Sequence, residues 1–219
     1  MATDYICSFT TTTGDGPSST GCWKFDEGSG AIANDSVDGN HCTIIGATWT
    51  TGKSASALSF DGNDYVTRAN PSSALKPSPQ VAISAWINPT ALDSSGSEVV
   101  SMGDSYALRV KTDGNIVFFY FDGTTWRLVT TTGVDVRVGE WHHIVGQKTS
   151  SALQIYVDGV LRGSLNNTGT ITYNKGPDFF IGKHGNGDTR YDFIGTIDEV
   201  CVYSQALSAQ EVLALFNSC

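Results

Sequence analysis

The chain has 219 residues, a formal net charge of −9 at pH 7, a pI near 4.7, 40% hydrophobic residues and 16% charged residues. This acidic balance excludes nucleic acid as a partner, because phosphates need clustered Lys and Arg. No apolar run is long enough to cross a bilayer, so membrane insertion is not expected. The length, together with the many Gly, Thr, Ser, Val and aromatic residues, favours one large all-β domain.

The first segment of the chain differs from the rest. Residues 1–20 are rich in Thr, Ser and Gly and lack hydrophobic periodicity. This composition predicts a flexible N-terminal arm or linker, of the kind that connects a domain to other domains of a larger parent protein. The folded domain is expected to span residues 21–219.

Short stretches of alternating apolar and polar residues follow, separated by turn signals, as is typical of strands in a sandwich. Asp-Gly occurs six times, and two of these pairs predict hairpins with two-residue turns, at 106–121 and 153–165. The predicted strands are too many for one flat sheet, and we therefore expect two packed sheets. The other predicted strands are 22–26, 56–60, 64–68, 80–88, 97–102, 126–131, 141–148, 178–182 and 193–203.

One helix is predicted near the C-terminus. Ser208 and Glu211 have the spacing of a capping box, in which each side chain bonds the other residue's backbone. Val212, Leu215 and Phe216 then form an apolar face over about two turns. A helix this short is unstable alone, so it is expected to pack on the sandwich.

Eight sequence segments between residues 21 and 212 resemble, in the same order, the laminin-G-like (LamG) jelly-roll domains of the concanavalin A-like lectin/glucanase superfamily. The resemblance implies a two-sheet antiparallel jelly-roll sandwich with a short C-terminal helix. It is a poor guide to function, because the family includes sugar-binding modules, adhesion modules and enzyme appendages. The segments are GCWKFDEGSG (21–30), DSVDGNH (35–41), ALSFDGNDYV (57–66), VAISAWINP (81–89), GEWHHIVG (139–146), LQIYVDGVL (153–161), FFIGKHG (179–185) and IGTIDEVCVYSQALSAQEV (194–212).

Four aspartates are candidate ligands for calcium, which takes six to eight oxygens: Asp26, Asp61, Asp64 and Asp198. The resemblance implies a structural Ca²⁺ where the first and last strands meet, which would bring Asp26 and Asp198 together. The loop 35–40 is an alternative oxygen-rich site. The competing interpretation is that all these carboxylates cap turns.

The five cysteines are spread along the chain without the CxxC pairs typical of zinc sites. One or two disulfides and a secreted origin are therefore expected. Cys22 and Cys201 lie in the two strands that we expect to pair, so we predict a bond between them. Cys219 is expected to bond either Cys7 or Cys42.

Sugar recognition needs an aromatic face for the C–H surface of the ring and polar groups for its hydroxyls. Alternation along a strand sends two of the four aromatic residues in 118–121 away from the core. With the aromatic residues of neighbouring strands, they form either a ligand platform or a surface hidden by a loop. The stacking candidates are Tyr106, Tyr120 and Trp126.

The loop 182–193 is the second candidate for ligand binding, because functional groups tend to lie on loops held by a rigid scaffold. It offers His184, Arg190 and Tyr191. Arg190 has the planar fork that suits a carboxylated or sulfated sugar. The alternative is an ordinary solvated polar loop.

Catalysis is not expected. A retaining glycosidase needs two carboxylates about 5–5.5 Å apart, and the five Glu residues are far apart in the sequence. No GxSxG motif is present. The sequence thus predicts a non-catalytic module of a secreted or cell-surface protein that binds polysaccharide or another glycan. The alternatives are a protein–protein or matrix adhesion module and a glycan-active enzyme domain.

Overall fold

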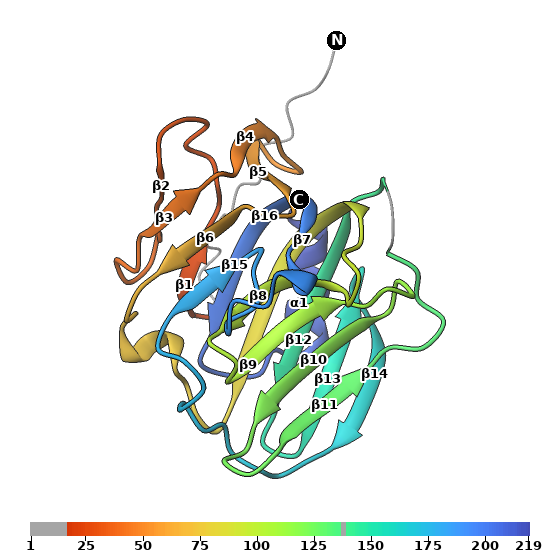
Figure 1. The fold of residues 1–219 in the computed structure, drawn as a ribbon. Coiled ribbons are helices and arrows are strands. Elements are labelled where there is room, and N and C mark those ends of the chain that lie inside the picture. The colour runs from red at the N-terminus through yellow and green to blue at the C-terminus, as the bar shows by residue number, and fades with distance from the viewer. Residues whose placement is uncertain (1–16, 137–138) are drawn as a thin grey trace.

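The computed structural model describes residues 17–136 and 139–219. It consists of two antiparallel sheets packed face to face, with one helix on the outside (Figure 1). This confirms the all-β jelly-roll expectation. Within the described residues, no helix is long and apolar enough to span a membrane.

The first sheet has eight strands in the order β14-β13-β12-β7-β16-β5-β4, with β1 paired to β16 outside this path. Most of its strands agree with the sequence prediction, but β4 was not predicted and β1 begins three residues early. The bounds are β1 Ser19–Trp23, β4 Thr48–Thr51, β5 Ser56–Asp61, β7 Val81–Ala91, β12 His142–Lys148, β13 Ala152–Val157, β14 Val160–Asn166 and β16 Ile194–Tyr203.

The second sheet also has eight strands, in the order β11-β10-β9-β8-β15-β6-β3-β2. Here β2 and β3 were not predicted from the sequence. Two short 3₁₀ helices, η1 (Ser73–Leu75) and η2 (Thr189–Tyr191), lie in its connections. The strand bounds are β2 Ile32–Ala33, β3 Cys42–Ile45, β6 Tyr65–Arg68, β8 Ser97–Met102, β9 Tyr106–Val110, β10 Ile116–Phe121, β11 Trp126–Thr130 and β15 Phe179–Ile181.

The main hydrophobic core lies between the sheets. It is built from the inward-facing residues of alternating strands, for example Ile83, Ala85 and Ile87 of β7, all fully buried. Trp23 of β1 stacks on Phe179 of β15 across the sandwich, with ring centroids 4.8 Å apart. The first and last strands thus contribute to the same core as the central ones.

The two predicted hairpins differ in their turns. Asp158 and Gly159 join β13 to β14 as a two-residue turn, and both have positive φ (51° and 76°), as a type I′ turn requires. The connection between β9 and β10 is longer than predicted. It includes residues 111–115, because Lys111 pairs with Asn115 outside the ladder.

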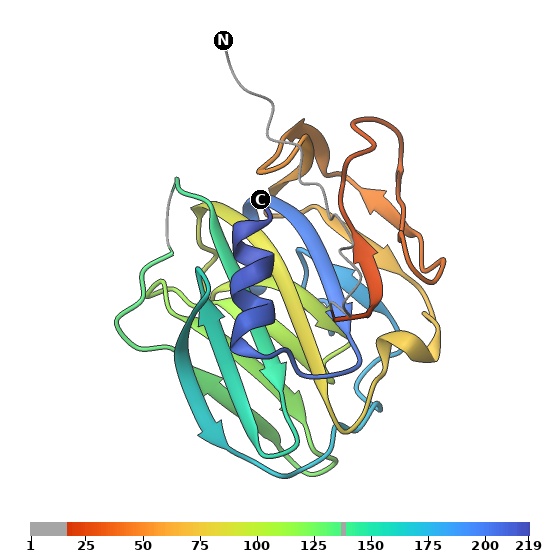
Figure 2. The same ribbon diagram turned by 180° about the vertical axis from the view of Figure 1, so that it is seen from behind.

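A single helix, α1 (Ala209–Asn217), lies across the outer face of the first sheet, over β7 and β12 (Figure 2). The predicted capping box is present, with Ser208 and Glu211 bonding each other's backbone. Val212 is fully buried in a second apolar cluster that includes Tyr156 and Tyr203 of the sheet. Packing on this face supplies the stability that a two-turn helix lacks alone.

A disulfide joins Cys22 of β1 to Cys201 of β16, which are directly opposite each other in the antiparallel pair. This is the partnership expected from the sequence. Cys42 is a free, buried thiol on β3, so its pairing with Cys219 is wrong. The other proposed partner, Cys7, lies outside the described residues, as does most of the predicted arm.

Candidate functional site

Two of the predicted stacking residues are core residues. Tyr106 and Tyr120 are both fully buried between the sheets. The Tyr106 hydroxyl donates to the Leu75 carbonyl oxygen over 2.9 Å, and the Tyr120 hydroxyl bonds Asn167 Oδ1. These bonds let a tyrosine lie in an apolar core. Neither can stack on a ligand, and this part of the prediction is wrong.

The other two aromatics of β10 point to the outside of the second sheet. Phe119 and Phe121 lie between Phe118 and Tyr120 along the strand, so alternation turns them outward. They are nevertheless only 7% and 4% exposed. Neighbouring side chains cover them, so an exposed platform must be formed by those neighbours.

Trp126 of β11 provides the exposed ring. It lies opposite Phe121 in the strand pair, with ring centroids 5.0 Å apart, and is 42% exposed. Its indole Nε1 donates to the Asp104 carbonyl oxygen over 3.0 Å, which fixes the ring orientation. The Lys175 ammonium lies 4.3 Å from the Phe121 ring centroid and 5.1 Å from that of Trp126. Leu128, two residues along β11, is 51% exposed on the same face. We call Phe121, Trp126, Leu128 and Lys175 the platform.

An arginine continues this face beside the platform. The Arg109 guanidinium of β9 lies 5.1 Å from the Phe119 ring centroid and 3.9 Å from that of Tyr191. The same group forms an ion pair with Glu98 of β8, which is fully buried. Burial raises the pKa of Glu98 to about 7, although Arg109 opposes this increase. Arg109 of β9 therefore connects the second sheet to Tyr191 in the loop 182–193.

The loop 182–193 lies on this same face. His184 packs against Tyr191, with ring centroids 4.9 Å apart, and its Nε2 is 3.6 Å from Asp104 Oδ1. Asp104 thus contacts both Trp126 and His184, so the structure brings together three of the predicted binding residues. Burial, and to a smaller extent Arg109, lowers the pKa of His184 to about 4, which keeps the ring neutral at pH 7.

Arg190 is in the same loop but is already engaged. Its guanidinium forms two hydrogen bonds with the Asp188 carboxylate, at 2.9 and 2.6 Å. The pair is exposed to solvent, where such interactions contribute little to stability. An anionic ligand at Arg190 would have to displace Asp188.

The four aspartates predicted to bind calcium form two separate pairs. Asp64 accepts a hydrogen bond from the Asp61 backbone within one turn, and Asp26 is near Asp198. Asp61 lies opposite Ile194 in the β5–β16 pair, which places it about 13 Å along β16 from Asp198. Across the described ranges, no group of three His, Cys, Asp or Glu residues has the geometry to hold a metal ion. The four do not form one calcium site, and a structural calcium stays a prediction.

The alternative calcium loop, residues 35–40, is a capped turn. The buried Asp35 carboxylate accepts hydrogen bonds from the backbone N–H groups of Cys22, Val37, Asp38 and Asn40. These bonds use the lone pairs that a calcium ion would need. The carboxylate ties the loop to β1.

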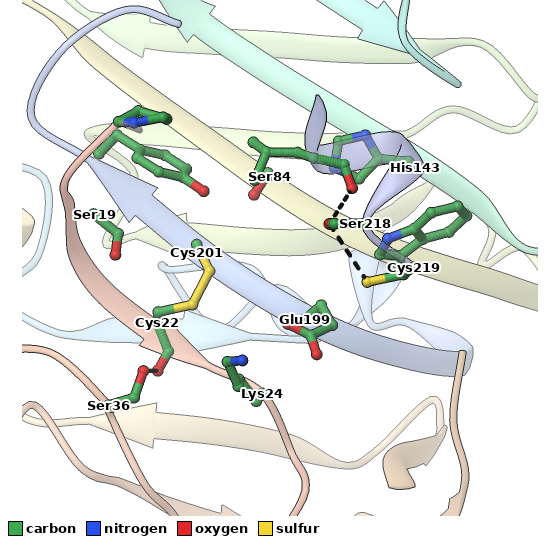
Figure 3. A pocket seen from close by; sticks show the side chains of 14 residues that line it. Ser19, Cys22, Lys24, Ser36, Ser84, His143, Glu199, Cys201, Ser218 and Cys219 are labelled. Atoms are coloured by element: carbon green, nitrogen blue, oxygen red, sulfur yellow. Dashed lines mark hydrogen bonds between the residues drawn. A yellow bond between two sulfur atoms is a disulfide. The ribbon is translucent and has the colours of Figure 1, made fainter. Parts of the chain in front are cut away.

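A cavity lies on the opposite face of the molecule, against the outer surface of the first sheet (Figure 3). Its volume is about 190 Å³. It is bounded by β1, by the C-terminal end of α1 and by the outward side chains of β7, β12 and β16. The residues that give it chemical character are Lys24, Ser84, Trp86, His143, Glu199 and Tyr203.

Two buried atoms at this cavity lack a hydrogen bond. Among the residues that the structure describes, Glu199 Oε1 and His143 Nδ1 have no partner. Glu199 has φ +49° and lies in an irregularity of the β16–β7 pairing between Asp198 and Cys201. Burial raises the pKa of Glu199 to about 7 and lowers the pKa of His143 to about 4.

Sequence reasoning found the platform tryptophan and the loop but missed Lys175, Arg109 and the whole cavity. Lys175 comes from a long connection before β15, and no local pattern places it beside Trp126. His142 and His143 are adjacent in the sequence, but no sequence pattern indicated that His143 would line a cavity together with residues of β1 and α1.

The fold is a two-sheet β-sandwich with an exposed aromatic face on the second sheet and a cavity on the first. A family model described as the concanavalin A-like lectin/glucanases superfamily (Laminin_G_3) matches residues 60–213. The chain belongs to this family. No curated protein sequence matches the chain significantly.

Among solved structures, the chain is similar to domain 4 of AbnA, a GH43 extracellular arabinanase from Geobacillus stearothermophilus, in complex with arabinotriose. The TM-score is 0.72 at 22% identity, over 92% of this chain and 99% of that domain. It is also similar to the binding domains of Paraclostridial Mosquitocidal Protein 1 (TM-score 0.68, 17% identity) and of botulinum neurotoxin serotype G (0.67, 14%). Both similarities include 91% of this chain, which corresponds to 52% of the mosquitocidal-protein domain and 50% of the neurotoxin domain. At these identities the likeness concerns the fold.

Proposed function

We propose that this domain is a non-catalytic carbohydrate-binding module that holds a poly- or oligosaccharide on the platform. The observation that carries the proposal is Trp126, an indole that is 42% exposed and yet fixed by its bond to Asp104. A sugar ring presents an apolar C–H face that stacks on an aromatic ring. Because the indole is already oriented, little conformational entropy is lost on binding.

The groups around Trp126 provide the polar part of recognition. Lys175 forms no ion pair within the described part of the chain, so its ammonium is available to ligand hydroxyls or to a carboxylate. His184 and Tyr191 lie along the same face, beyond Asp104. Polar groups at the edge of an aromatic surface are the usual arrangement of sites that bind hydroxylated ligands.

Two further facts support this proposal. The similar domain of the arabinanase was solved with arabinotriose, so the fold is compatible with oligosaccharide binding. The disulfide between Cys22 and Cys201 suits a secreted or cell-surface protein. A polysaccharide outside the cell would then be the partner, with this domain attached to others in a larger parent protein.

A protein-binding adhesion module is the second candidate. Exposed apolar side chains support it: Leu161 and Leu165 of β14 are 46% and 49% exposed, and Leu213 of α1 is 47% exposed. The similar toxin structures are described as binding domains. Leu213 lies on α1, on the outer face of the first sheet, whereas the platform lies on the outer face of the second sheet, so substitutions at Leu213 and at Trp126 distinguish the two candidates.

The test is affinity electrophoresis against neutral polysaccharides, including arabinan, and against anionic ones that contain uronic acids. Retardation by one polymer supports the carbohydrate proposal. Lys175→Ala then separates ligand types: a loss confined to uronic polymers identifies an acidic glycan, and an equal effect on all polymers identifies a neutral one. If no polymer retards the protein, the proposal is wrong and the adhesion alternative gains support.

A further inference from the structure

The cavity lies on the outer face of the first sheet (Figure 3), whereas the platform lies on the outer face of the second sheet. We infer that it is a second binding site, which takes one neutral sugar unit through Glu199, His143, Lys24 and the hydroxyls of Ser84 and Tyr203. This inference rests on the proposed carbohydrate function and deepens it. The domain would then bind glycan on two faces.

Two buried polar atoms at the cavity are unpaired within the part of the chain that the structure describes. A buried polar atom without a hydrogen bond costs about 1–3 kcal/mol, and Glu199 Oε1 and His143 Nδ1 both lack one among the described residues. His143 is only 3% exposed and lines the cavity. Native structures keep few such atoms, and each calls for an explanation. A hydroxylated ligand, with a small rotation of either side chain, would supply the missing partners.

The backbone at Glu199 is in an unfavourable conformation, with φ +49°. A non-glycine residue with φ near +50° costs of order 1–3 kcal/mol, and such residues cluster at functional sites. The irregularity between Asp198 and Cys201 interrupts the ladder with β7, and interruptions of this kind redirect a side chain. Here the redirected side chain is a carboxylate that lines a cavity.

The polar groups that line the cavity match an uncharged ligand. Glu199 accepts hydrogen bonds, Lys24 donates them, and Ser84 and Tyr203 do both. Burial leaves Glu199 partly protonated near pH 7, and Lys24 offsets the negative charge that it retains, so neither a strong anion nor a strong cation is favoured. A ring that bears several hydroxyls matches this mixture, because each hydroxyl donates one bond and accepts two.

The size of the cavity suits a small ligand. The volume of about 190 Å³ corresponds to about six water molecules at roughly 30 Å³ each. It is below the range of roughly 300–1,000 Å³ for pockets that hold drug-sized ligands. The Cys22–Cys201 disulfide provides an apolar wall for the C–H face of a ring. Trp86 borders it but is only 3% exposed, because Phe216 stacks on its ring and the Lys53 ammonium lies 4.2 Å from the ring centroid. One sugar unit therefore fits, and a continuous polymer does not.

The test uses the five tryptophan indole N–H signals in ¹⁵N–¹H NMR spectra, assigned with single substitutions. The probes are the methyl glycosides of arabinofuranose, glucose, galactose and mannose. We expect at least one to shift the Trp86 signal, with a dissociation constant of about 1 mM, as suits a small ligand. The Trp126 signal should move less, and Trp126→Ala should retain the Trp86 response.

Glu199→Ala should weaken this binding at least tenfold, whereas the matched control Glu140→Ala, at an exposed carboxylate, should not change it. Ser84→Ala serves as a second variant if Glu199→Ala fails to fold, as judged from the dispersion of its spectrum. Polysaccharide retardation should be normal in all three variants.

The inference is overturned if no glycoside moves the Trp86 signal, or if Glu199→Ala and Glu140→Ala respond alike. If wild-type protein still binds polysaccharide in that case, the platform proposal stands alone. If neither glycoside nor polysaccharide binds, the proposed function itself is wrong. A shift of Trp126 alone would place the monosaccharide on the platform.

Discussion

Replacing Trp126 with alanine should abolish most of the affinity for polysaccharide. The side chain is 42% exposed, which for a tryptophan of roughly 250 Å² leaves about 100 Å² in water. A sugar ring that covers half of this area, and buries an equal area of its own, removes about 100 Å² from water. At about 25 cal/mol per Å², the contact is worth about 2.5 kcal/mol, or about 70-fold in the dissociation constant.

Isothermal titration calorimetry with the polymer identified by electrophoresis would measure this change. Trp126→Phe should keep most of the affinity, because it retains an aromatic face and loses only the bond to Asp104. Trp49→Ala is the matched control. Its indole also donates to a backbone carbonyl, that of Gly30, but it lies on β4 at the far edge of the first sheet.

A dissociation constant for Trp126→Ala within about twofold of the wild-type value would refute the stacking contact, since the loss of a contact of this area should cost much more free energy. It is equally refuted if Trp49→Ala causes the same loss, because the effect would then be one of stability. Melting temperatures of all three variants separate the two cases.

Four other predictions concern stability. Burial lowers the pKa of His143 to about 4, from 6.5 in the unfolded chain, so stability should fall by about 3 kcal/mol as the pH drops through this window. The hydrogen bond with Asp158 raises the pKa of His142 in the folded protein. The stability that protonated His142 adds is therefore full below about pH 6.5 and is lost as the pH rises through the pKa of His142 in the folded protein. Urea unfolding of the wild type and His143→Gln between pH 4 and 8 should resolve the first effect, and a pH-independent difference would contradict it. Gly146→Ala places a Cβ 2.7 Å from two core side-chain atoms and should cost about 1–3 kcal/mol by urea unfolding; an unchanged midpoint would mean that the core adapts. A structural calcium predicts that Ca²⁺ raises the melting temperature and EDTA reverses the rise, whereas no response to either would remove the basis for that ion.

Local patterns in the sequence were sufficient where the chemistry is local. The capping box at Ser208 and Glu211 correctly predicted where α1 begins, because both partners lie within one turn. The turn at Asp158 and Gly159 was equally readable, since positive φ restricts which residues can occupy it.

The sequence could not show which face of a strand points into the core, nor which segments far apart in the chain lie next to each other. The run of aromatics in β10 has the same alternation whichever face is inside, and Tyr120 was assigned to the wrong one. Strands β2, β3 and β4 are short and exposed on one side, so their apolar signal is weak. The cavity required β1 and α1 to meet across the first sheet, which no periodicity encodes.

The bond between Cys22 and Cys201 also governs how the domain opens. A five-residue strand that pairs with a single neighbour, as β1 does with β16, would ordinarily fray and exchange its amide hydrogens early. The disulfide joins β1 to β16, a strand at the centre of the sheet, so β1 separates from β16 only when the whole domain unfolds. Because β1 carries one wall of the cavity, that wall lasts as long as the fold itself while the disulfide is intact, and loses this covalent constraint once the disulfide is reduced.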